Sequence, residues 1–204
     1  AIAEDEKQNL WLTVGDGVNY FNRNAQNVKH YSKNLGNYDA GGALSGYRAS
    51  SGIYWVGTWQ EGYYRYNAVT DKFDTQATNE KLANSSETES AVLHDATIWS
   101  FCETKDGDFW IGTHNAGINR FNAIKKTFTK YKPNNSGNEI TNNIAWSCYE
   151  DTKNNRWIGT AYGLNRMNYT TSQITKYYPQ EKIPTVSNLA LCWISLRMTK
   201  GSYG

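Results

Sequence analysis

The sequence predicts an all-β protein built from repeated four-stranded antiparallel units, and two observations support this fold class. A phrase of Trp, a β-branched residue, Gly and Thr begins at Trp55, Trp110 and Trp157, and a worn copy begins at Trp11. Aromatic residues make up 14% of the chain and only 3 residues are Pro, a composition that suits short strands. Recurrence at intervals of about 45 to 55 residues indicates a repeat architecture.

The first two units each contain short runs of strand-forming residues bounded by Gly, Asn or charged turns. In the first unit we expect strands at residues 2–5, 10–14, 17–22 and 28–31. In the second unit we expect them at residues 43–50, 53–58, 62–67 and around Phe73. Residues 76–95 are rich in Asn, Ser, Thr and Glu, which predicts a surface loop between units.

The third and fourth units follow the pattern most closely. Their expected strands are 98–103, 109–113, 117–122 and 128–131, then 144–150, 157–160, 163–168 and 174–177. A fifth unit begins near Ser187, but residues 193–204 show no alternation and no further copy of the phrase. We therefore predict a single domain over 1–204, with units at about 1–34, 43–76, 96–133 and 142–179 and a fragment at 186–204.

Four-stranded antiparallel units with Trp and Gly at fixed places are typical of β-propeller blades. The Trp is expected in the core between blades, because an aromatic side chain buries roughly 150 to 250 Å². The Gly of the phrase should let a neighbouring backbone approach closely. A second Gly should supply the positive φ of the following turn, at Gly17, Gly62, Gly117 and Gly163.

A blade cannot bury both of its faces alone, and four blades with a fragment are few for a closed ring. The fold class we predict is therefore a partial propeller, completed either by the remaining blades of a longer chain or by a homo-oligomer. The net charge is +2 with no basic stripe, which argues against nucleic acid as a partner. No apolar run approaches the roughly 20 residues of a membrane helix, and no leader precedes Ala1, so we expect no membrane contact by this segment and no signal peptide in this sequence.

The three cysteines form no C-x-x-C pair, so neither a disulfide framework nor a zinc site is expected. Cys102 and Cys148 lie one residue out of register within their repeats. That offset puts them on opposite faces of their strands, from which we predict buried thiols with no shared role. The sequence suggests no metal and no cofactor.

Recurring charged residues are interpreted as structural. Glu4, Glu103 and Glu150 each lie seven residues before the Trp of their blade, where the second blade has Arg48. A second series consists of Arg65, Arg120 and Arg166. We expect their guanidinium groups to pair across or between blades. Since no carboxylate pair, nucleophile elbow or phosphate loop is evident, we predict no catalytic residues and no enzyme activity.

Residues that differ from blade to blade at one end of the ring are better candidates for a binding site. The loops between second and third strands, and those joining blades, lie at the same end of a propeller. Aromatic rings stack on the apolar face of a sugar, while amides and carboxylates bond its hydroxyls. The predicted ligand-binding residues are Trp59, Gln60, Glu61, His114, Asn115 and Tyr162. Trp99 and Trp146 could add walls, and packing against the next blade is an equal alternative for them.

The phrase Trp-Ile-Gly-Thr, followed by Gly-Ile-Asn-Arg-Phe-Asn and Phe-x-x-Tyr at 110–131, resembles the two-component regulator propeller repeat. That repeat occurs in periplasmic sensor regions of bacterial hybrid two-component histidine kinases, many implicated in sensing glycan breakdown products. The resemblance extends over nearly the whole chain and is strongest over 96–178. It implies a non-catalytic periplasmic sensor module that binds an oligosaccharide or another small ligand. The alternatives are a polysaccharide lyase or glycosidase propeller, and a protein-interaction scaffold.

Overall fold

The computed structural model describes residues 1–32, 41–75, 93, 95–122, 124–125 and 127–179. Within them the chain is all-β, and no helix there has the length and apolarity needed to cross a membrane. The predicted fifth unit at 186–204 and nearly all of the predicted loop at 76–95 fall outside these residues.

The strands form four separate four-stranded sheets, which we call blades 1 to 4. Blade 1 contains β1 (Ile2–Glu4), β2 (Leu10–Val14), β3 (Gly17–Asn22) and β4 (Asn27–Ser32). Blade 2 contains β5 (Gly41–Arg48), β6 (Tyr54–Trp59), β7 (Tyr63–Asn67) and β8 (Lys72–Thr75). Blade 3 contains β9 (Ile98–Glu103), β10 (Phe109–Thr113), β11 (Ile118–Asn122) and β12 (Thr127–Tyr131). Blade 4 contains β13 (Ala145–Glu150), β14 (Arg156–Thr160), β15 (Gly163–Met167) and β16 (Ile174–Tyr177).

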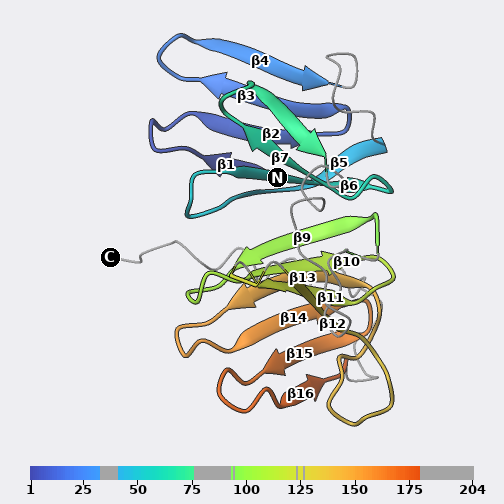
Figure 1. Ribbon diagram of the computed structural model, residues 1–204. Helices are drawn as coiled ribbons and strands as arrows, with labels where there is room; N and C mark the ends of the chain where they lie inside the picture. The colour runs from blue at the N-terminus through green and yellow to red at the C-terminus, as the bar shows by residue number, and fades with distance from the viewer. Residues whose placement is uncertain (33–40, 76–92, 94, 123, 126, 180–204) are drawn as a thin grey trace.

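Every blade is an antiparallel meander in sequence order, which confirms the predicted fold class. The blades are arranged as a fan, with β4 and β16 at its outer edges and the first strand of each blade towards the middle (Figure 1). Among the described strands, β1 packs on β5, β5 on β9 and β9 on β13, with no comparable packing of β13 on β1. The described part of the chain is therefore an open series of blades.

In blades 1 to 3 the Trp of the phrase lies in the core between blades, as predicted, and it faces the following blade. Trp11 lies in one buried cluster with Tyr54 and Val56 of blade 2. Trp55 packs with Phe109 and Ile111 of blade 3. Trp110 is only 2% exposed and packs with Ile158 of blade 4. The core is therefore a set of layers between blades, because side chains alternate between the two faces of each strand.

The glycines of the phrase allow the next blade to come close. A Cβ on Gly112 would lie 2.5 Å from the Ala145 carbonyl oxygen on β13, and one on Gly57 would lie 2.7 Å from Ile98 Cβ on β9. The second glycine supplies a turn, since Gly117 has φ of 69° and its added Cβ would clash with the Tyr131 carbonyl oxygen. Both predicted roles for Gly are confirmed at these positions.

The recurring glutamates join each blade to the one before it. Glu103 of blade 3 accepts a hydrogen bond from the Ser50 backbone N–H at 2.6 Å and another from its hydroxyl at 2.7 Å. Glu150 of blade 4 accepts from the Lys105 backbone N–H at 3.1 Å. In blade 2, Arg48 makes the corresponding contact with Glu6, at 2.9 Å. In blades 2 to 4 the residue seven positions before the Trp of the phrase thus contacts the first turn of the preceding blade, whether it is a glutamate or an arginine.

Cys102 and Cys148 are buried and lie on opposite strand faces, as predicted, but these two faces are packed against each other. The offset alone therefore does not argue against a shared role. Cys102 pairs with Trp110 and so shares the face of blade 3 that packs on blade 4. Cys148 pairs with Ile158 and shares the face of blade 4 that packs on blade 3. Opposite faces of adjacent blades point at each other, so the two thiols meet in one buried cluster.

The first and last blades of the fan expose positions that are buried in the other blades. On blade 1, Ile2 and Val28 are 71% and 60% exposed, whereas Phe128, which corresponds to Val28 in blade 3, is buried. On blade 4, Tyr177 is 42% exposed and stacks on Trp157 at 5.9 Å between ring centroids. We call these two surfaces the open faces of blades 1 and 4.

Candidate functional site

Three aromatic side chains from two blades meet at the end of the fan where the sequence predicts a site. The ring centroids of Trp59 and Trp99 lie 5.9 Å apart in an edge-to-face arrangement. His114 lies 5.5 Å from Trp59 and 6.0 Å from Trp99. We call Trp59, Trp99 and His114 the aromatic corner. Two of its members were predicted ligand-binding residues, and Trp99 was one of two possible walls.

Backbone hydrogen bonds fix the two loops of the corner onto the segment that leads into blade 3. The Gln60 backbone N–H donates to the Thr97 hydroxyl at 3.1 Å, and the His114 backbone N–H donates to the Thr97 carbonyl at 3.2 Å. The Asn115 backbone N–H donates to the Asp95 carboxylate. Loops anchored at both blades hold their side chains in a defined position, as a binding site needs.

Trp99 reaches the corner through a β-bulge. Gly112 pairs with Ser100 and Thr113 pairs with Ile98, so Trp99 is the extra residue of β9. The same bulge occurs in blade 4, where it contains Trp146. Since a bulge redirects a side chain, the bulge is a feature that reasoning from strand alternation missed.

The polar groups of the corner suit hydroxylated ligands. Trp59 is 40% exposed, and Gln60, Glu61 and Asn115 are exposed beside it. The Trp99 indole N–H donates to His114 Nδ1 at 3.4 Å, an interaction at the long end of the hydrogen-bond range. An exposed indole beside an amide and a carboxylate offers a stacking surface with donors and acceptors around it.

The remaining predicted residue does not join this group. Tyr162 is exposed on blade 4, and its ring contact is with Tyr178 at 5.7 Å. Among the residues that the structure describes, Trp146 makes no ring contact with the aromatic corner and is half-buried. The predicted set therefore divides into a group on blades 2 and 3 and a separate tyrosine pair on blade 4.

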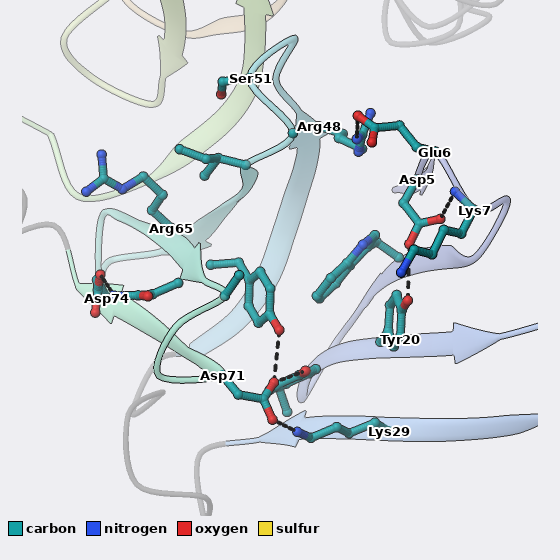
Figure 2. A pocket seen from close by; sticks show the side chains of 17 residues that line it. Asp5, Glu6, Lys7, Tyr20, Lys29, Arg48, Ser51, Arg65, Asp71 and Asp74 are labelled. Carbon is teal, nitrogen blue, oxygen red and sulfur yellow. Dashed lines mark hydrogen bonds and ion pairs between the residues drawn. The ribbon is translucent and has the colours of Figure 1, made fainter. Parts of the chain in front are cut away.

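A hollow that the sequence did not suggest opens at the opposite end of the fan, between blades 1 and 2. It has a volume of about 830 Å³, and we call it the rim cavity. Figure 2 shows side chains of both signs around it, among them Lys29, Arg48, Asp5 and Asp71. Its aromatic lining comprises Trp11, Tyr20, Tyr31 and Tyr66.

The charges around the rim cavity are largely engaged with one another. Asp71 pairs with Lys29 and accepts hydrogen bonds from the Tyr31 and Tyr66 hydroxyls at 2.8 and 2.9 Å (Figure 2). Hydrogen bonds from Lys29 and Tyr31 lower the pKa of Asp71. Burial and the hydrogen bond to Asp71 raise the pKa of Tyr31. A ligand would have to displace these contacts, so the aromatic corner is the better candidate site.

The two series of charged residues that the sequence singled out have structural partners. Glu103 and Glu150 make the inter-blade contacts described above. Arg120 pairs with Asp108, the residue that precedes β10 in the same blade. Arg65 and Arg166 lie over the rings of Trp55 and Trp157, at 5.8 and 5.9 Å from the centroids. The recurring glutamates of blades 3 and 4 thus contact the preceding blade, whereas the arginines contact residues of their own blade.

Comparison with known proteins identifies the repeat. Residues 93–115, which include the third copy of the phrase, match the family model described as Two component regulator propeller. Over these residues the chain is similar to a two-component regulator propeller repeat. A histidine kinase, P4 of Formosa agariphila, is 30% identical to this chain over 131 residues, which are 64% of this chain and 9% of that protein.

Two solved structures share the fold of this chain. The extracellular domain assigned to the hybrid two-component system BT3049 of B. thetaiotaomicron superposes with a TM-score of 0.60 at 24% identity, over 78% of this chain and 18% of that one. PorZ, a surface component of the type-IX secretion system of Porphyromonas gingivalis, superposes with a TM-score of 0.62 at 20% identity, over 92% and 28%. The chain thus spans less than a third of each of these relatives.

Proposed function

We propose that this chain is part of a periplasmic, non-catalytic sensor of a two-component signalling protein, and that it binds an oligosaccharide at the aromatic corner. The meeting of Trp59 from blade 2 with Trp99 and His114 from blade 3 is the observation that carries the proposal. The kinase relative and the extracellular domain of a hybrid system support the signalling context.

A sugar suits this corner for a physical reason. An exposed indole offers an apolar surface that a pyranose ring covers with its C–H groups, which removes apolar area from water. Gln60 and Glu61 follow Trp59 in the chain and Asn115 follows His114, and their exposed side chains carry donors or acceptors for hydroxyls. Tyr162 is included as an outlying contact for a longer glycan.

A titration of the chain against a panel of neutral and acidic oligosaccharides, followed by calorimetry, tests the proposal. We expect Trp59→Ala to weaken binding by at least about tenfold, since buried aromatic anchors dominate such sites. Tyr169→Ala is the matched control, because Tyr169 is an exposed aromatic residue in the turn between β15 and β16, at the opposite end of the fan. Equal loss in both variants, or no loss in either, would remove the corner from the proposal.

The same experiment separates the two alternatives. Release of new reducing ends or of unsaturated sugars from a polysaccharide would show a glycosidase or a lyase. No binding to any member of the panel, together with defined binding of a protein partner, would favour an interaction scaffold. Both outcomes contradict the sensor proposal as stated.

We further propose that the open faces of blades 1 and 4 pack against additional blades, supplied by a longer chain or by a second copy. The exposure of Ile2, Val28 and Tyr177 supports this proposal, since equivalent positions between blades are covered. Light scattering should give a mass above that of one 23.2 kDa chain. Val28→Asp should reduce this mass, and a wild-type chain that stays monomeric at high concentration would exclude self-association.

A further inference from the structure

The buried layer between blades 3 and 4 contains two thiols that face each other. Cys102 on β9 and Cys148 on β13 belong to the same buried cluster, with Trp110 and Ile158 around them. The Cys148 sulfur lies 3.6 Å from the Trp110 carbonyl oxygen and 3.8 Å from the Ser100 hydroxyl. Ser100 lies two residues before Cys102 on β9, and Trp110 is the cross-strand partner of Cys102, so the Cys148 sulfur lies beside the position of Cys102.

Cys102 lines a cavity that opens to the surface. A cavity of about 480 Å³ opens where the first turns of blades 2 and 3 meet blade 4, and Cys102 lines it together with Glu103, Lys105 and Glu150. Cys148 is not among the residues that line this cavity, and it lies in the same inter-blade layer as Cys102. A small reagent entering the cavity therefore meets Cys102 first.

The chemistry of the two thiols is also unequal. The hydrogen bond from Cys148 lowers the pKa of the Cys102 thiol, whereas burial raises the pKa of the Cys148 thiol. A lower pKa increases the fraction of thiolate, which is the nucleophile in thiol–disulfide exchange. Cys102 is thus placed to react first with a disulfide reagent. Cys148 is placed to react second, with the Cys102 sulfur.

From this geometry we propose that Cys102 and Cys148 form a modification site, a dithiol that a small-molecule disulfide oxidises to an inter-blade disulfide. The Cys102 thiolate attacks one sulfur of the small disulfide, forming a mixed disulfide and releasing one thiolate. Cys148 then attacks the Cys102 sulfur and displaces the second thiolate, which takes up the proton of the Cys148 thiol as it leaves. The two cysteines lose two electrons and two protons in total, and one small disulfide becomes two thiols. The bond fastens blade 4 covalently to blade 3.

The test is oxidation of the full chain with oxidised glutathione, using a Cys192→Ser background so that only the two facing cysteines react. We expect the folded protein with both cysteines present to lose about 2 Da and to recover its original mass after reduction. Digestion of the oxidised protein should give two peptides joined by a disulfide between Cys102 and Cys148. In the same background, Cys148→Ser should stop at a mixed disulfide on Cys102, a gain of about 305 Da. In the Cys102→Ser protein, Cys148 should react at least about tenfold more slowly than Cys102 reacts in the Cys148→Ser protein.

Three results would overturn the proposal. The first is that both thiols stay free under conditions that convert Cys192 of the unsubstituted chain. The second is that the native dithiol protein accumulates the glutathione adduct without the internal bond. The third is that the bridge forms only after denaturation. The main result comes from a protein that keeps both Cys102 and Cys148. A substituted variant that fails to fold therefore does not obscure it.

Discussion

Blades 3 and 4 carry nearly the same sequence pattern, yet one face of blade 3 is closed and the corresponding face of blade 4 is open. Trp110 stacks on Tyr131 at 5.2 Å and 22°, and Trp157 stacks on Tyr177 at 5.9 Å and 24°. Trp110 is nevertheless buried, whereas Trp157 is half-buried and Tyr177 is exposed. The same local structure is thus made twice, and only the presence of a neighbouring blade turns it into core.

The two tryptophans are also held differently. The Trp157 indole N–H donates to the Asp151 carboxylate at 2.9 Å. The Trp110 indole N–H is buried and finds no acceptor among the residues that the structure describes. A closed interface therefore holds its Trp by packing, and an open face holds it by a hydrogen bond within its own blade. This comparison leads to four predictions.

The largest expected effect is at the closed interface. Trp110→Ala should lower the free energy of unfolding by about 3 to 5 kcal/mol, because it removes a large buried side chain and leaves a cavity between blades. Trp157→Ala is the matched change on the open face and should have an effect of about 1 kcal/mol. Urea unfolding followed by circular dichroism measures both. Equal effects would mean that the face of blade 4 is covered in solution, for example by a second copy.

The close approach of the next blade predicts the second effect. Gly112→Ala should destabilise the fold by about 1 to 3 kcal/mol, since its new Cβ would overlap the Ala145 carbonyl and force blade 4 to shift. Gly15→Ala is the control, because a Cβ at Gly15 would meet nothing within 4 Å. Thermal unfolding compares the two variants. A neutral Gly112→Ala would show that the blades can separate there at little energetic expense.

The inter-blade hydrogen bonds of the glutamates predict a smaller effect. Glu103→Ala removes two hydrogen bonds to Ser50 in the preceding blade and should lower stability by about 1 kcal/mol. Glu4 occupies the same repeat position on the open face of blade 1, where its partner is Arg23 in its own blade at 3.4 Å. Glu4→Ala should change stability by less than about 0.5 kcal/mol, because exposed ion pairs contribute little. A loss at Glu4 as large as at Glu103 would contradict the distinction.

The smallest expected effect depends on pH. Burial acts to raise the pKa of Asp151, but hydrogen bonds from Asn155 and Trp157 lower this pKa from 3.8 to about 2. Because the folded pKa is the lower one, Asp151 stabilises the fold above about pH 4, and this contribution is lost as pH falls to about 2. Asp151→Asn should therefore lower stability by less than about 1 kcal/mol at neutral pH. Unfolding measured from pH 7 down to pH 2 should show the difference shrinking, and a constant difference would exclude charge as its cause.

Much of the fold was predictable from sequence because each blade is a local structure. Alternation, turn residues and the position of Trp and Gly are features of a single repeat, and they place the strands of blades 3 and 4 within a residue or two. The aromatic corner was predictable only in part. Trp59 and His114 follow from their place after the repeated phrase, but they belong to different blades. Trp99 joins them through a bulge that alternation does not reveal.

Two features depended on how blades meet. Strand alternation assigns Cys102 and Cys148 to opposite faces correctly, but it does not say that those faces are neighbours. The rim cavity likewise lies between two blades and is lined by residues that no single repeat brings together. Such relations require the packing of one sheet on another.

The sequence alone determined the repeat, its four-stranded unit and the end of the blade at which the repeats differ, because these are set by short-range periodicity and turn chemistry. The tertiary structure alone decided which faces are covered, that the two thiols meet and which loop side chains gather at the aromatic corner. The physical reason is that a blade fixes the direction of each side chain, whereas burial and contact depend on the blade beside it.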